Sequence, residues 1–197
     1  MSDLKLGIFE IFSAFLPGLP YLLGVFILSN DNEISLLLLQ KTITELKGLE
    51  IGGLVTIAYF IGFSSQYLAY EVFKLIVQNV KLWKGRLGDY PVSIGKRGFD
   101  IAKIRHRSFE NYQTLNAFLA LRIMCYNMFF SLGLVCLSII LSSLFYPSFN
   151  LNLFYVFVAC ATFMILFLRR AVSYHEWSHG LISDSIRAIE WLLKKEN

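Results

Sequence analysis

Residues 123–145 read IMCYNMFFSLGLVCLSIILSSLF, and this stretch decides the class of the protein. It contains no Asp, Glu, Lys or Arg. A helix needs about 20 apolar residues to cross the ~30 Å hydrocarbon layer of a bilayer, so the stretch predicts a membrane-spanning helix. Three further apolar stretches with few charges lie at 8–28, 51–70 and 151–168. The sequence therefore predicts four transmembrane helices.

The composition agrees with a polytopic, all-α membrane protein. Hydrophobic residues make up 56% of the chain, charged residues only 16%, and the mean hydropathy is +0.57. No linker-like tract separates a globular unit, so residues 1–197 are expected to form a single membrane domain. The first stretch is interrupted by Pro17, Gly18 and Pro20 and lacks a following cleavage site, so it is interpreted as an uncleaved anchor. All three cysteines lie within predicted spans, which favours packing over disulfide bonding.

The distribution of Lys and Arg predicts the orientation of the spans, because basic loops are retained in the cytoplasm. The connection at 30–50 has a net charge of −2 and is expected outside, whereas the connection at 71–121 has a net charge of +5 and is expected inside. Four spans then place both termini in the cytoplasm, and 147–150 becomes a short external turn. A multi-pass protein of the bacterial inner membrane is expected.

The inner connection at 71–121 shows helical rather than loop patterning. Apolar residues recur at helical spacing from Tyr67 to Trp83 and again after Phe99, and a glycine- and proline-containing segment separates the two runs. This pattern predicts an antiparallel cytoplasmic hairpin. The tail at 169–197 contains a further amphipathic pattern from about Ala171 to Lys194, which predicts a C-terminal amphipathic helix.

Small residues form a stripe along the second span. Small side chains allow close helix contact where lipid provides no hydrophobic drive, so the stripe predicts helix packing, either within the chain or between subunits of a homo-oligomer. Polar groups at lipid depth are expected to face other helices or a water-filled path. The stripe consists of Ala58, Gly62, Ser65 and Ala69, and the polar groups include Gln66 and Asn127.

Basic residues concentrate in the inner connection before the third span. Attraction to anionic lipid headgroups, worth about 1 kcal/mol per basic residue near the membrane surface, would explain this group. RNA or an RNA-laden partner is the alternative, with Phe109 and Tyr112 as stacking residues. The basic group contains Lys96, Arg97, Lys103, Arg105, His106 and Arg107.

His175, Glu176 and His179 follow the fourth span and form the pattern H-E-x-x-H. On a helix this spacing places two imidazoles one turn apart as zinc ligands, with the glutamate as general base. A catalytic zinc needs a third protein ligand, and the chain after His179 contains no glycine-based extension that would supply one. A membrane-embedded zinc metalloprotease is therefore the alternative hypothesis, and no cofactor is expected otherwise.

Arg170 and His175 overlap this pattern and form R-x4-H, which resembles the signature of the HEPN ribonuclease superfamily. The resemblance implies a surface pair between helical protomers, in which His performs acid–base chemistry and Arg stabilises phosphate charge. The structural alternative is that Arg169 and Arg170 extend to lipid phosphates while His175 is a packing residue.

The whole layout resembles small membrane accessory proteins of bacterial antiphage loci, notably those encoded beside the RNA-targeting nuclease of type VI-B CRISPR systems. The resemblance is carried by FLPG at 15–18, AYFIG at 58–62 and the R-x4-H motif. It implies a helical oligomer, a pore, and a motif that need not be a working nuclease site. We therefore expect a non-enzymatic, oligomeric membrane effector whose partners are lipid, further copies of itself, and an RNA-guided nuclease or RNA.

Overall fold

The computed structural model describes residues 2–29, 41, 44–45, 47–79, 94–145 and 151–196. The helices are α1 (Ser2–Ser29), α3 (Gly48–Ser64), α4 (Gln66–Asn79), α6 (Ile94–Arg107), α7 (Phe109–Phe145) and α8 (Leu151–Glu196). Within these ranges, α1, α7 and α8 are long and apolar enough to cross a membrane, and α3 with α4 adds a fourth span if the bent pair is counted as one. This all-helical architecture is consistent with a membrane protein.

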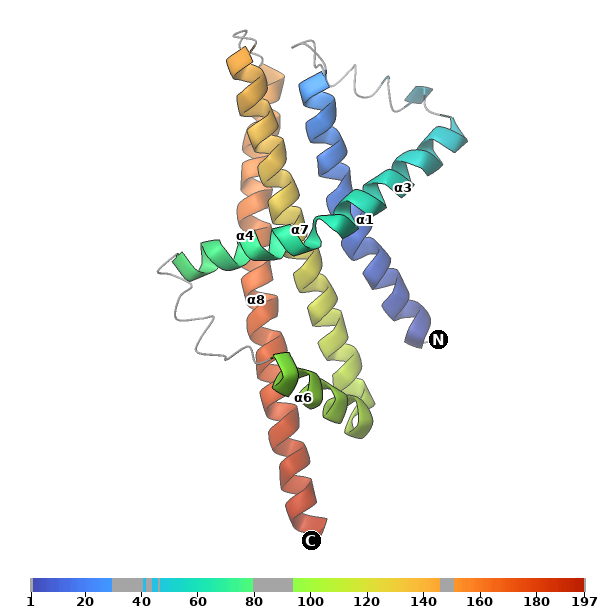
Figure 1. Ribbon diagram of the computed structural model, residues 1–197, viewed down its shortest axis with the longest axis vertical. Helices are drawn as coiled ribbons and strands as arrows, with labels where there is room; N and C mark the ends of the chain where they lie inside the picture. The colour runs from blue at the N-terminus through green and yellow to red at the C-terminus, as the bar shows by residue number, and fades with distance from the viewer. Residues whose placement is uncertain are drawn as a thin grey trace.

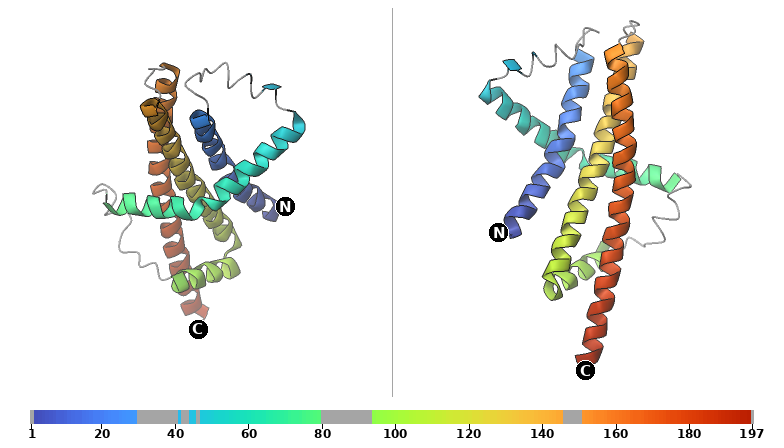
Figure 2. Two further views of the ribbon diagram at one scale, coloured as in Figure 1. Left: turned by 45° about the horizontal axis from the view of Figure 1, so that its top comes forward. Right: turned by 180° about the vertical axis from the view of Figure 1, so that it is seen from behind.

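Helices α1, α7 and α8 run alongside one another, and α7 packs against both of its neighbours (Figures 1 and 2). Apolar side chains from all three helices form their shared core. Its buried members include Ile27 of α1, Val135 and Ile139 of α7, and Leu153 of α8. Helix α1 continues through Pro17 and Pro20 without a break. The three cysteines are free and buried, as expected for packing residues.

The second apolar stretch forms two helices rather than one straight span. Helices α3 and α4 meet at Ser65 with a bend of 46°. The pair crosses the α1–α7–α8 layer obliquely in Figure 1, with α3 packed on α1 and α4 packed on α7. The expected continuation of this stretch into a helix beyond residue 70 is present as α4, which ends at Asn79.

The amphipathic tail is continuous with the fourth apolar stretch. Helix α8 runs from Leu151 to Glu196 without interruption. At about 1.5 Å per residue its length is ~69 Å, roughly twice the hydrocarbon thickness of a bilayer. The predicted tail helix is therefore the distal half of α8 rather than a separate element.

The distal half of α8 packs with α6 and the first turns of α7. Ile104, Leu115, Ile182 and Ile189 are buried together in this second core. A turn at Ser108 separates α6 from α7, so the predicted run through Phe99 into the third span is two helices. Among the described residues, α6 packs on α7 and α8 and α4 packs on α7. They do not show the antiparallel hairpin expected at 71–121.

The layer of long helices has an upper and a lower end in Figure 1. In Figure 1 the C-terminal end of α1, the end of α7 and the start of α8 lie at the top, whereas both termini point toward the lower half. Helix α6 lies at the lower end as well, beside the distal half of α8. The acidic connection therefore leaves α1 at the upper end, whereas the basic connection leaves α4 near the middle of the layer and continues in α6 at the lower end.

Candidate functional site

Helices α1 and α3 cross at backbone contact through four small residues. A Cβ atom added at Gly18 would overlap the carbonyl oxygen of Ala58, and one added at Gly62 would overlap the carbonyl oxygen of Ala14. All four residues are buried. Glycine is required at both positions because the overlapping atoms belong to the facing backbone, which cannot rotate away as a side chain can.

Asn127 of α7 holds the bend between α3 and α4. Its side-chain nitrogen Nδ2 donates a 2.7 Å hydrogen bond to the Gly62 carbonyl, and its Oδ1 accepts a 3.0 Å bond from the Ser65 hydroxyl. In a straight helix the Gly62 carbonyl would accept a hydrogen bond from the N–H of Gln66, four residues on. Asn127 is fully buried, so its amide replaces a backbone partner at a depth where water cannot do so.

Other polar groups surround this break. The Ser65 hydroxyl also reaches the Gly62 carbonyl at 3.0 Å, and the buried Tyr21 hydroxyl lies beside Ser65 without strict hydrogen-bond geometry. Gln66, expected to be polar at lipid depth, is half-buried at the start of α4. Polar groups from α1, α3 and α7 thus converge at the point where the second apolar stretch breaks.

The small-residue stripe predicted along the second span packs against other helices of the same chain. Ala58 and Gly62 face α1, Ser65 bonds to Asn127, and Ala69 is fully buried against α7 and α8. Of the two roles that the sequence left open, these contacts describe packing inside one protomer. A role between subunits must then fall on another surface.

Arg122 of α7 and His175 of α8 form a polar contact where the apolar parts of both helices end. Arg122 Nη1 lies 3.1 Å from His175 Nδ1. Arginine has no acceptor, so the guanidinium donates and Nδ1 of a neutral His175 carries no proton. Both side chains are half-buried. The contact ties α7 to α8 at the expected membrane boundary.

The two histidines of H-E-x-x-H lie close together, and no third ligand joins them within the described part of the chain. The rings of His175 and His179 are 4.5 Å apart between centroids and roughly perpendicular. Among the described residues, no group of three or more His, Cys, Asp or Glu side chains could hold a metal ion. A zinc site here would need ligands from outside the described ranges, and it would place the metal beside the Arg122 guanidinium.

Arg170 and His175 do not form a pair. Five residues on a helix correspond to a rotation of about 140°, so the two side chains project from different faces of α8. Arg169 and Arg170 are exposed, while His175 faces Arg122 on the neighbouring helix. Within one protomer, the arginine–histidine contact is therefore Arg122–His175 and not the R-x4-H pair.

This geometry separates the expected effects of two alanine substitutions. His175→Ala should lower the free energy of unfolding by about 1–3 kcal/mol, because it removes the acceptor of a half-buried guanidinium. Arg170→Ala should change it by at most ~0.5 kcal/mol, as is typical of exposed positions. Denaturant unfolding in detergent measures both, and His175→Gln, which keeps an acceptor, is the control. Equal losses for His175→Ala and Arg170→Ala would contradict the assignment.

The predicted basic group lies on α6, next to its turn into α7. Arg105, His106 and Arg107 are exposed, and Lys103 is half-buried. Lys96 and Arg97 belong to α6, but their side chains fall outside what the structure describes. The Arg105 guanidinium lies over the Tyr112 ring at 5.4 Å, which places a cation and an aromatic side chain on one surface.

Two functional contacts were not found by the sequence reasoning. Ala14 and Gly18 are four residues apart in the first stretch, the same small-residue spacing as Ala58 and Gly62, and this spacing was an available signal. Arg122 falls between the predicted connection and the predicted third span. Its signal was a lone cation one residue before an uncharged apolar stretch.

No protein-family model, curated protein or solved structure matches this chain. The class of the protein therefore follows from its own residues. Its described residues are helical, with three helices long and apolar enough to cross a membrane, a fourth if the bent α3–α4 pair is counted as one span, and a polar break in that pair.

Proposed function

We propose that this chain is a multi-pass protein of the bacterial inner membrane that assembles into oligomers and acts on that membrane as an effector of phage defence, able to open a pore. The observation that carries the assembly step is the exposed N-terminal half of α3. The role in defence comes from the resemblance of the sequence to antiphage accessory proteins. No catalytic chemistry is required by this proposal.

Helix α3 supports oligomerisation because only its C-terminal half is packed. From Gly48 to Ile57 every residue is exposed, and a Cβ added at Gly52 or Gly53 would meet no atom within 4 Å. Its exposed half is apolar around its circumference apart from Glu50 and Thr56. A helix that is apolar on every side is covered by lipid or by another helix. Small residues favour contact with another helix, because they let the two backbones approach closely.

The division of charge supports the orientation. The basic helix α6 and both termini lie toward the lower end of the layer, and the acidic connection leaves α1 at the upper end. Retention of Lys- and Arg-rich loops then places α6, the distal half of α8 and both termini in the cytoplasm. The short connection between α7 and α8 is external in this arrangement.

Assembly and membrane activity are tested by placing bulk on the exposed half of α3. Gly52→Leu touches nothing within its own protomer, so it should leave the fold intact but reduce the oligomer to smaller species. The mass in lipid nanodiscs measures assembly, and dye release from liposomes measures permeabilisation. We expect dye release to fall about tenfold or more, a difference of ~1.4 kcal/mol in association.

Gly180→Leu is the matched control, since it adds the same bulk to α8 at a position where an added Cβ also meets no atom within 4 Å. Its mass and dye release should equal those of the wild type. Protection of cells against phage should follow the same order, with reporters at both termini confirming a cytoplasmic location. A wild-type protein that is monomeric in nanodiscs and releases no dye would disprove the proposal.

A further inference from the structure

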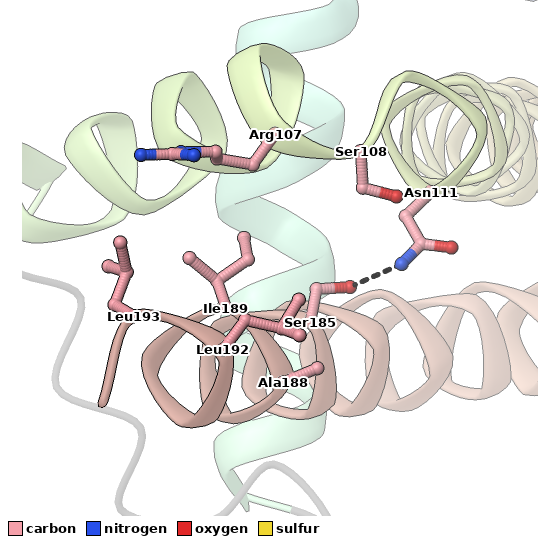
Figure 3. Close-up of a pocket in the computed structure, with 8 residues that line it drawn as sticks. All are labelled: Arg107, Ser108, Asn111, Ser185, Ala188, Ile189, Leu192 and Leu193. Carbon is pink, nitrogen blue, oxygen red and sulfur yellow. Dashed lines mark hydrogen bonds between the residues drawn. The ribbon is translucent and has the colours of Figure 1, made fainter. Parts of the chain in front are cut away.

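A groove opens where the turn between α6 and α7 faces the end of α8 (Figure 3). Its volume is about 280 Å³, and its lining combines one guanidinium, two hydroxyls and one carboxamide with an apolar floor. The Asn111 side chain donates a 3.2 Å hydrogen bond to the Ser185 hydroxyl across it. No carboxylate lines it. The lining residues are Arg107, Ser108, Asn111, Ser185, Ala188, Ile189, Leu192 and Leu193.

Cations surround the groove on two helices. Arg105 and Arg107 are exposed at the end of α6, and Lys194 and Lys195 are exposed near the end of α8. Arg107 also lines the groove, whose other lining residues are uncharged, so these cations give this end of the molecule a positive field. The charge fits an anionic partner.

Large aromatic side chains are exposed on the same end of the molecule. Phe99 is 69% exposed, Phe109 is 50% exposed and Trp191 is 62% exposed. Cations lie against aromatic faces here, with Lys195 over Trp191 at 5.3 Å and Arg105 over Tyr112. Interleaved cations and open aromatic faces suit a partner that brings both phosphates and flat rings.

The length of α7 disfavours lipid headgroups of the same bilayer as that partner. Helix α7 begins at Phe109, 14 residues before Ile123, where its uncharged part begins, which corresponds to about 21 Å along the helix. The screening length at physiological ionic strength is ~8 Å. The groove is therefore a site for a soluble anion.

We propose that this surface binds single-stranded RNA, with one nucleotide in the groove and its phosphates on Arg105 and Arg107. The proposal rests on the cytoplasmic orientation inferred above. An acidic protein would satisfy the cations but would not need exposed ring faces or a groove of nucleotide size. RNA satisfies all three features, and Ser108, Asn111 and Ser185 offer hydrogen bonds to a ribose 2′-hydroxyl.

Fluorescence anisotropy with a labelled single-stranded RNA of about 12 nucleotides tests the proposal, using the full chain in nanodiscs of zwitterionic lipid. Affinity should fall as salt rises. Arg105→Gln/Arg107→Gln should weaken binding about tenfold or more and reduce the slope of log K against log salt by ~1.4, the value for two phosphate contacts. Phe109→Ala should weaken binding about tenfold without changing the slope, because stacking is uncharged.

Lys41→Gln/Lys47→Gln is the matched control, since it removes the same charge from exposed residues at the opposite end of the second apolar stretch. It should bind RNA as the wild type does. An equal loss in this control, equally tight binding of single-stranded DNA or of oligo-glutamate, or no binding at all would overturn the proposal. Gly52→Leu should keep its RNA affinity per protomer, so a failure of assembly and a failure of RNA binding can be told apart.

Discussion

Gly62→Ala is expected to lower the free energy of unfolding by about 3 kcal/mol, although it adds only one methyl group. The new Cβ would overlap the Ala14 carbonyl oxygen, so α1 and α3 must move apart along their crossing. Separation would also strain the hydrogen bonds that Asn127 and Ser65 make to the Gly62 carbonyl. Unfolding by denaturing detergent, followed by circular dichroism or by separation of labels on α1 and α3, measures the loss.

Gly133→Ala is the matched control for this substitution. Gly133 is also in a membrane-crossing helix, but a Cβ there would meet only the Met164 sulfur at 3.5 Å, an ordinary contact distance. Its replacement should leave stability unchanged or raise it slightly, because alanine favours the helix by about 1 kcal/mol relative to glycine. Similar stability for Gly62→Ala and the wild type would show that α1 and α3 do not cross at these residues.

Asn127→Leu is expected to straighten the second apolar stretch. The substitution removes the amide that holds the Gly62 carbonyl, and that carbonyl is then free to accept the N–H of Gln66 as in a regular helix. Removal of the 46° bend should lengthen the distance between spin labels at Leu49 and Gln78 by about 4 Å. The loss of two hydrogen bonds in a buried site should also cost about 1–3 kcal/mol of stability.

Asn116→Leu provides the comparison, because it makes the same change on α7 at a half-buried position away from the break. Its label distance should equal that of the wild type. An unchanged distance in Asn127→Leu would mean that the bend is fixed by the packing of α3 on α1 and of α4 on α7, and that Asn127 only follows it.

The sequence predicted the apolar, helical character of the chain better than the contacts between its helices. Apolar stretches near 8–28, 123–145 and 151–168 correspond to parts of α1, α7 and α8. The stretch at 51–70 lies across the α3–α4 break, because nothing in its own residues shows that Ser65 will meet Asn127. Bond partners separated by 62 residues cannot be read from local periodicity.

The candidate site shows the same division. The residues of R-x4-H and H-E-x-x-H are neighbours along the chain, but helical rotation sets the face of α8 that each occupies. Arg122, which contacts His175, comes from α7. The basic group was evident from composition. Its place at the lower end of the helical layer became clear only once α6 and the first turns of α7 were placed beside the distal half of α8.

Hydrophobicity and charge by themselves determined that this chain is helical, is apolar enough to cross a membrane and has one basic connection, because these quantities add along the sequence. Tertiary structure alone decided that α1 and α3 touch at backbone distance, that Asn127 bends the second stretch, and that Arg122 meets His175. Each of these depends on where two separate helices meet in space, and close packing and directional hydrogen bonds select that arrangement.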